Sequence, residues 1–457
     1  MSMMGVRILG FCTAALASVC VTTAAVAASP TANDLADLLT ASNDALQYNP
    51  EYVAARAEFV AARELVPQAK GKLLPQLGLK SQYDFVHESV SGDYYGVVDI
   101  DRDDDYHRWT YGAQLQQALY HPELTIGLDQ ADLKLQQAGY KLQAAQDALL
   151  IGVSDAYFGL LAADDAVRFA DAELRAVGEQ LDQVRVRASS GLATDADVKD
   201  ALAQFELANA SQTDAQNAQA NAIARLEALT GRSYAHVKRL PATLKLVPPQ
   251  PLDETVWTAR AEQVSVAVLL QKVTLQIADL DHEKARKMAW PKVDLVGAAF
   301  GLDSSGGISG ERDEDQERIG VMMNMPLYTG GQISATKRQT LAMQERAQAL
   351  YDNAVVSAVR DTRIAYRNSA SGLQRVEALK RAVDATIASE DAMRAGFDAG
   401  TRTTADVLAA VERRYAAERD YAAARYKFLV NSLRLKQVSG NLLVADLAQI
   451  NRLLQAP

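Results

Sequence analysis

The sequence predicts a mainly α-helical fold with a small β component, in which four strands per chain cross a membrane and long helices extend away from it. Three observations predict it: two matching segments far apart in the chain, two pairs of short alternating segments, and two helical stretches of unusual length. The matching segments are "GLATDADVKDALAQF" from Gly191 and "GTRTTADVLAAVERR" from Gly400, which agree at six positions with an offset of 209 residues. An internal match of this kind dictates the architecture, so we expect two structural repeats.

The first 27 residues predict a secretory signal peptide. Arg7 precedes an apolar stretch that ends in small residues, and A-V-A at residues 25–27 fits a cleavage site. A transmembrane anchor and a lipid attached at Cys20 are the alternatives. Both cysteines, Cys12 and Cys20, lie in this segment, so we expect no disulfide, thiolate metal site or catalytic cysteine in the mature chain.

The net charge argues against one class of partner, and the hydropathy argues against one way of crossing a membrane. The formal net charge of −10 argues against a nucleic-acid partner. After the signal segment, no uninterrupted apolar run approaches the ~20 residues that a spanning helix needs. Strands that pair around a closed barrel are the other structure that can cross a bilayer.

The first predicted repeat covers residues 28–231 and begins with a helix followed by a strand pair at about 75–119. In "QLGLKSQYDF" and "WTYGAQLQQAL" apolar and polar residues alternate. Alternation over about ten residues is typical of a tilted strand with one face on lipid and the other on the lumen. Half-buried strands of a soluble protein alternate in the same way, so this pattern alone leaves both open.

An acidic insert, "HESVSGDYYGVVDIDRDDDYH", separates these two strands. It predicts a long polar loop outside the membrane. Its spaced aspartates resemble a calcium-binding loop only in part, because Asp104 replaces the required glycine and Thr110 stands where a glutamate should close the loop. We therefore expect a solvated loop.

A very long helix at about 122–189 and a shorter one at about 195–230 complete the first repeat. No proline interrupts the long stretch after Pro122, and leucines recur every seven residues from Leu128 to Leu149. Sustained heptads predict helices that supercoil against their neighbours. A soluble coiled coil explains this stretch equally well, but it does not explain the strands.

The second repeat has the same order of elements. "RIGVMMNMPLY" alternates clearly, "KVDLVGAAFGL" alternates poorly, and the acidic "DSSGGISGERDEDQ" between them predicts another polar loop. The expected segments are a linker at 232–251, a repeat at 252–440 with a helix, a strand pair at about 291–328, a long helix at about 332–397 and a helix at about 404–438, and a C-terminal segment at 441–457.

The two matching segments mark helical hairpins. Thr194 and Thr403 each precede an aspartate by three residues, an acidic variant of the capping box that begins a helix. Gly191 and Gly400 stand where the preceding long helices must end. Both hairpins are therefore expected at the end of the long helices opposite the strands.

Four strands cannot close a barrel, and an open sheet edge is not tolerated in lipid. Three chains would supply twelve strands. Two chains would supply eight, and a barrel of about eight strands leaves almost no lumen.

The sequence resembles the outer-membrane efflux protein (TolC) family. The resemblance rests on "GTRTTADVLAA", "YAAARYKFLVNSLRLKQVSGNL", "GLATDADVKDALAQFELA" and "LPQL", and it covers essentially the whole mature chain. It implies a homotrimer with a 12-stranded outer-membrane β-barrel, continued by a long α-helical coiled-coil barrel through the periplasm of a Gram-negative cell. It also implies two kinds of partner: a periplasmic adaptor (membrane fusion) protein at the tip, and an inner-membrane ABC exporter or proton-driven efflux pump.

The resemblance also implies a constriction beside the two hairpins. Arg402 would hold the closed state through hydrogen bonds to Asp197 of the other hairpin, with Asp406 nearby. Phe397 stands where the family has a tyrosine, and Ala409 where the nearest relatives have an acidic ring. The residues matching the tip that adaptors grip are Gly191, Leu192, Gly400 and Thr401.

Simpler roles are open for these residues, because Asp197 and Asp406 can serve only as helix caps and Arg402 as a solvated turn residue. The five histidines are scattered and no catalytic motif is present, so we expect no enzyme, cofactor or metal site. The sequence predicts the exit duct of a tripartite export system. A periplasmic coiled coil without a pore is the alternative, and the cargo, whether protein, drug or metal, stays open.

Overall fold

The computed structural model describes residues 36–94, 98–234, 236–241, 244, 246–307 and 310–455. The predicted signal peptide, residues 1–27, lies outside the described residues. The elements in chain order are α1 (Leu38–Tyr48), α2 (Pro50–Arg63), α3 (Leu65–Gly71), β1 (Gln76–Tyr94), β2 (Val98–Tyr120), α4 (Pro122–Ser189), α5 (Asp195–Thr230), α6 (Glu254–Val264), α7 (Val266–Lys287), β3 (Lys292–Ser304), β4 (Arg312–Asn324), α8 (Gln332–Asp398), α9 (Thr404–Val438) and α10 (Val444–Asn451).

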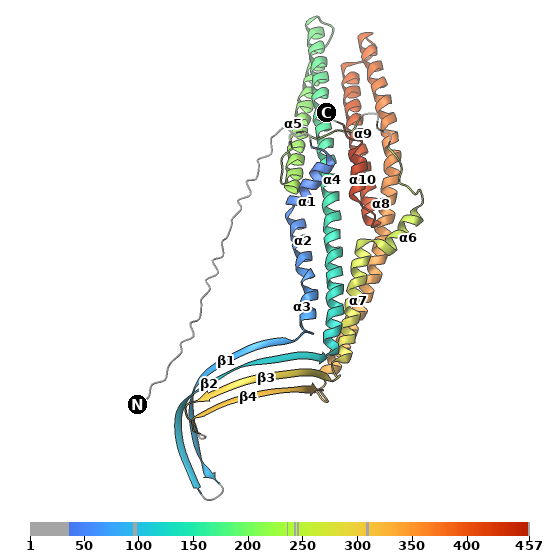
Figure 1. Ribbon diagram of the computed structural model, residues 1–457. Helices are drawn as coiled ribbons and strands as arrows, with labels where there is room; N and C mark the ends of the chain where they lie inside the picture. Colours follow the sequence, from blue (N-terminus) through green and yellow to red (C-terminus); the bar gives the residue numbers. More distant parts are fainter. Residues whose placement is uncertain are drawn as a thin grey trace.

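The strands form one antiparallel sheet in the order β1-β2-β3-β4, which lies at one end of the helices (Figure 1). Within the described residues, β1 and β4 each have one edge without a partner strand. The register aligns Leu77, Leu115, Gly297 and Ile319 across one face of the sheet. This face is apolar and open at both edge strands, since Leu77 is 74% exposed and Ile319 is 79% exposed.

The predicted polar loop at residues 87–107 is wrong, because β1 and β2 stay paired up to Tyr94 and Val98. Residues 98–107 of β2 pair only with β1, so this hairpin reaches well past β3 and β4 (Figure 1). The second predicted strand pair, about 291–328, is present, but its bounds differ from the prediction. β4 ends at Asn324, shortly before Pro326, which cannot donate to a ladder, and it begins at Arg312 inside the expected loop.

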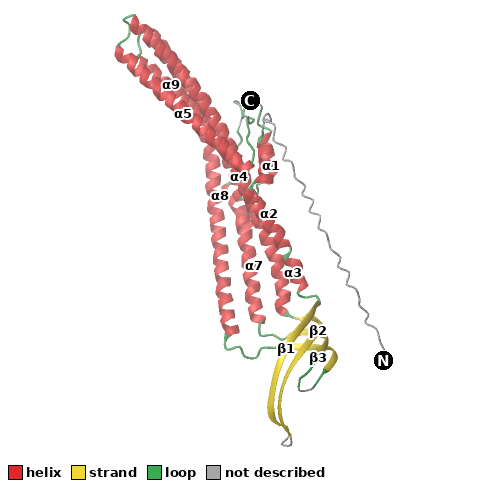
Figure 2. Cartoon of the chain, turned by 90° about the vertical axis from the view of Figure 1, so that its left-hand side faces the viewer, coloured by secondary structure: helices red, strands yellow, loops and turns green. Residues whose placement is uncertain are grey.

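Two helices run the length of the helical part. α4 has 68 residues and α8 has 67, so each is about 100 Å long at ~1.5 Å per residue. α5 and α9 return beside them in the half far from the sheet, while α7 packs between α4 and α8 nearer the sheet (Figure 2). Among the described residues, no helix has both the length and the apolar character of a membrane span.

The two largest of four apolar clusters among the described residues lie at different levels of the helices. The larger one lies midway along α4, where Tyr157 and Phe158 are almost fully buried in a cluster that also contains residues of α1, α9 and α10. The Tyr157 hydroxyl donates to the carbonyl of Lys238 at 2.9 Å, so the predicted linker is attached to the same cluster. The second cluster joins the two hairpins near the tip and contains Val177, Leu181, Ala201, Phe397, Val407 and Leu408.

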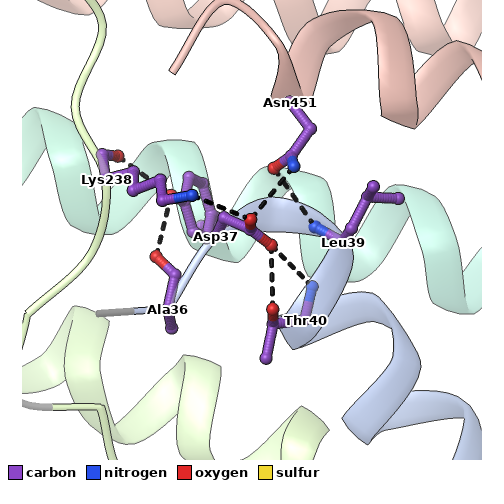
Figure 3. A network of polar contacts seen from close by, with 7 residues as sticks. Ala36, Asp37, Leu39, Thr40, Lys238 and Asn451 are labelled. Atoms are coloured by element: carbon purple, nitrogen blue, oxygen red, sulfur yellow. Dashed lines mark hydrogen bonds and ion pairs between the residues drawn. The ribbon is translucent and has the colours of Figure 1, made fainter. Parts of the chain in front are cut away.

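A polar network fastens three distant segments around α4 (Figure 3). Asp37 accepts hydrogen bonds from the amide and hydroxyl of Thr40, both at 2.9 Å, and from Lys238 and Asn451, both at 3.1 Å. Burial opposes ionisation, but these donors outweigh it and lower the pKa of Asp37 to about 2. The beginning of α1, the linker and the end of α10 are thereby held together.

Candidate functional site

The turns that join α4 to α5 and α8 to α9 lie together at the end of the molecule opposite the sheet (Figure 2). They share one backbone geometry: Gly191 has φ 73° and Gly400 has φ 74°, a conformation that favours glycine. In each turn an amide reaches back five residues, from Leu192 to Arg187 and from Thr401 to Gly396, both at 2.8 Å. These bonds satisfy carbonyls that the ends of α4 and α8 would otherwise leave without donors.

Both predicted capping boxes are present. Asp197 accepts from the hydroxyl of Thr194 at 2.7 Å and from its amide at 2.8 Å, and these bonds hold the pKa of Asp197 below its usual value. Asp406 accepts from the amide and hydroxyl of Thr403, both at 2.9 Å, and these bonds, with the nearby charge of Arg402, lower its pKa. Each carboxylate is therefore engaged by its own helix terminus.

Asp197 and Arg402 do not meet within the described part of one protomer. Arg402 is exposed, and its amide donates to the carbonyl of Gly396 at 3.2 Å. No hydrogen bond or ion pair joins the Arg402 guanidinium to a carboxylate among the described residues. A bond between Asp197 and Arg402 would therefore have to form between protomers or in another state.

Phe397 makes a contact that the sequence did not predict. Its ring is 7% exposed, and the guanidinium carbon of Arg187 lies 4.4 Å from the ring centroid. A cation over an aromatic face is attracted by the ring quadrupole. The contact joins the end of α4 to the end of α8, at the level where the family would place a tyrosine. The signal in the sequence was weak: both residues stand one turn before the glycine of their hairpin.

Ion pairs form a second link between the hairpins, one level farther from the tip. Arg419 of α9 donates to Glu173 of α4 at 2.9 Å. Burial raises the pKa of Glu173, and the charge of Arg419 opposes that rise. On the α8–α9 side, the buried Glu390 accepts from Arg394 at 2.9 Å and from Arg414 at 3.1 Å.

The tip itself is exposed. Gly191, Gly400 and Thr401 are open to solvent, and Leu192 presents an apolar side chain that is 72% exposed. Ala409 is also exposed, and its carbonyl accepts from the Arg413 guanidinium at 2.9 Å. This level of α9 thus carries a cation next to the position at which the nearest relatives are expected to have an acidic ring.

Among the described residues, no group of three or more His, Cys, Asp or Glu side chains could hold a metal ion.

Comparison with known proteins agrees with this geometry. A family model described as outer membrane efflux protein matches residues 41–232 and 259–441. The chain is 32% identical over 423 residues to the outer membrane protein TolC of Vibrio cholerae, covering 90% of this chain and 92% of that protein. It is 27% identical over 413 residues to the alkaline protease secretion protein AprF of Pseudomonas aeruginosa, covering 88% and 84% of the two chains.

Solved structures share the fold at lower identity. The CmeC outer membrane channel of Campylobacter jejuni matches with a TM-score of 0.78 and 14% identity, covering 92% of this chain and 90% of that chain.

Proposed function

Because the chain belongs to the outer membrane efflux protein family, we propose that it is the exit duct of a tripartite export system. The protein is a channel of the Gram-negative outer membrane that extends into the periplasm, and it is not an enzyme. In the proposed role it carries substrates from an inner-membrane pump across the periplasm and the outer membrane. Family membership argues against a coiled coil without a pore.

The observation that carries the proposal is the open four-stranded sheet with an exposed apolar face. Leu79 on β1 is 87% exposed and Val321 on β4 is 66% exposed, beside strand edges that lack partners in the described protomer. In lipid such a sheet is stable only when its edges are paired. Three protomers would close a 12-stranded barrel, and the long helices would continue it as an α-helical barrel.

In this proposal the chain consists of two structural repeats, residues 28–231 and 252–440. Each half has one or more helices, a strand pair, a very long helix and a shorter returning helix. The family model matches one segment in each half, which supports the division.

We further propose that the tip is the gate and the adaptor contact. Asp197, Arg402, Phe397 and Asp406 would form the constriction, with Arg187 as an additional member. The exposed turn residues Gly191, Leu192, Gly400 and Thr401 would meet the periplasmic adaptor, which links the duct to an ABC exporter or a proton-driven pump.

Relatives include both protease secretion proteins and an efflux protein, so several classes of cargo are compatible with the proposed duct.

Reconstitution of the purified mature chain tests the proposal. We expect a detergent-solubilised trimer that produces discrete conductance steps in a planar bilayer, small at rest because the tip is closed. A stable monomer that needs no detergent, or a trimer that gives no conductance steps under any applied voltage, would contradict the proposed duct.

A further inference from the structure

Three of the four segments that connect helices to strands on the proposed periplasmic side carry an unusual charge. In a chain with a net charge of −10, residues 65–75, 284–293 and 325–340 contain no Asp or Glu. The same segments contain eight Lys and Arg residues: Lys70, Lys72, Lys284, Arg286, Lys287, Lys292, Lys337 and Arg338. These three connections are therefore positively charged, while the fourth, at the beginning of α4, holds Glu123, which pairs with Lys292.

These cations lie at the depth of lipid headgroups if the strands span the hydrocarbon core. Lys337 is five residues into α8, and Arg286 is six residues before β3. At ~1.5 Å per residue, Lys337 lies about 8 Å along α8 from its first residue, and Arg286 stands one residue before the end of α7. The headgroup layer on each side of a bilayer is about 5–8 Å thick. Trp290, which is 47% exposed just before β3, is typical of this interface.

A cavity of about 580 Å³ opens between α7 and α8 at this level. We call it the basic pocket and define it by Arg286, Lys287, Trp290 and Lys337, which line it. Its two carboxylates are already engaged: Glu283 pairs with Lys287 at 2.6 Å, and Asp279 accepts from Gln344 at 2.9 Å.

Arg286 and Lys337 differ from their neighbours in the basic pocket. Neither side chain has a hydrogen bond or ion pair to any residue that the structure describes. Three cations and two carboxylates thus line one polar cavity, which leaves a formal charge of +1 on its lining. Arg286 is exposed and Lys337 is half-buried, so both cations can reach a ligand at the mouth of the cavity, and its positive lining is suited to an anionic group.

We propose that the basic pocket binds the phosphate of an anionic glycerophospholipid from the periplasmic leaflet. The acyl chains would lie on the exposed apolar residues at the end of β4, where Met323 is 67% exposed and Leu327 is 89% exposed. This inference rests on the proposed membrane-spanning barrel and goes beyond export: the bound lipid fixes the depth of the sheet in the membrane.

Equilibrium binding of fluorescent phosphatidylglycerol to the purified full-length protein in detergent tests the proposal. We expect tighter binding than for phosphatidylcholine of the same chain length. The variant Arg286→Gln/Lys337→Gln should bind phosphatidylglycerol about 30-fold more weakly, since each cation near a lipid surface contributes about fivefold. A charge-conserving variant, Arg286→Lys/Lys337→Arg, should bind almost normally.

The control replaces Lys380 and Arg381 by glutamine. These exposed cations lie on the same helix, about 65 Å from Lys337 at ~1.5 Å per residue, and their side chains form no hydrogen bond or ion pair with the described residues. Equal affinities for the two lipids, or equal losses in the pocket and control variants, would overturn the proposal. Competition by inorganic phosphate at low millimolar concentration would also overturn it in favour of a free-phosphate site. Single-channel conductance of the same preparations reports separately on the proposed duct.

Discussion

Replacing Arg187 by glutamine should weaken the closed state of the channel. The substitution removes the charge that lies 4.4 Å from the buried Phe397 ring and leaves the ring without its partner. A half-buried cation–π contact is worth about 1 kcal/mol. Three equivalent contacts in a trimer would contribute about 3 kcal/mol, which shifts a closed–open equilibrium by roughly 100-fold if the contacts break on opening.

Single-channel recording measures this shift directly as the fraction of time spent in the larger conductance state. The control is Arg185→Gln, since Arg185 lies on the same helix, is exposed and pairs with Asp182 at 3.2 Å. Phe397→Leu should reproduce the effect, and the double variant should add little to either single change, because all of them break one contact. An open fraction equal to that of the Arg185 control, or fully additive effects, would refute the reasoning.

Three further predictions concern other sites. Arg402→Ala and Asp197→Ala should each enlarge the basal conductance; unchanged conductance in both would leave them as turn and cap residues. Gly400→Pro should preserve the trimer yet abolish export in a secretion assay, since φ 74° is closed to proline; loss of the trimer would contradict the layout. Asp147 is 7% exposed, and burial raises its pKa from 3.8 to about 6. The contribution of its protonated form to the free energy of unfolding is therefore complete below pH ~4 and is lost as the pH rises through ~6. Asp147→Asn should therefore raise the thermal midpoint at pH 8 and have little effect at pH 4, and equal shifts at both pH values would count against this account.

The long helices and their turns could be predicted from the sequence because their determinants are local. The absence of proline after Pro122 and the heptad leucines indicate α4, and the Thr194–Asp197 spacing identifies the start of α5. The turn glycines are similarly local signals, because a left-handed φ strongly restricts the residue type.

The extended β1–β2 hairpin could not be predicted in the same way. From Asp101 to Asp105 the strand has no apolar face, yet it is held by its backbone ladder to β1. In the proposed barrel this part of the strand lies outside lipid and has no need to alternate, so periodicity fails there. The links between the hairpins also escaped prediction: Glu173 and Arg419 are 246 residues apart, and only the packing of α4 against α9 brings them together.

The edges of β1 and β4 that have no partner strand among the described residues have a genetic consequence. In the proposed trimer, each protomer would need two others to pair these edges, so one blocked copy would obstruct the whole duct. When a cell makes equal amounts of normal and blocked chains that associate at random, only about one trimer in eight contains three normal copies. Mutations that obstruct the passage without impairing strand pairing should therefore be dominant, whereas those that prevent pairing should be recessive.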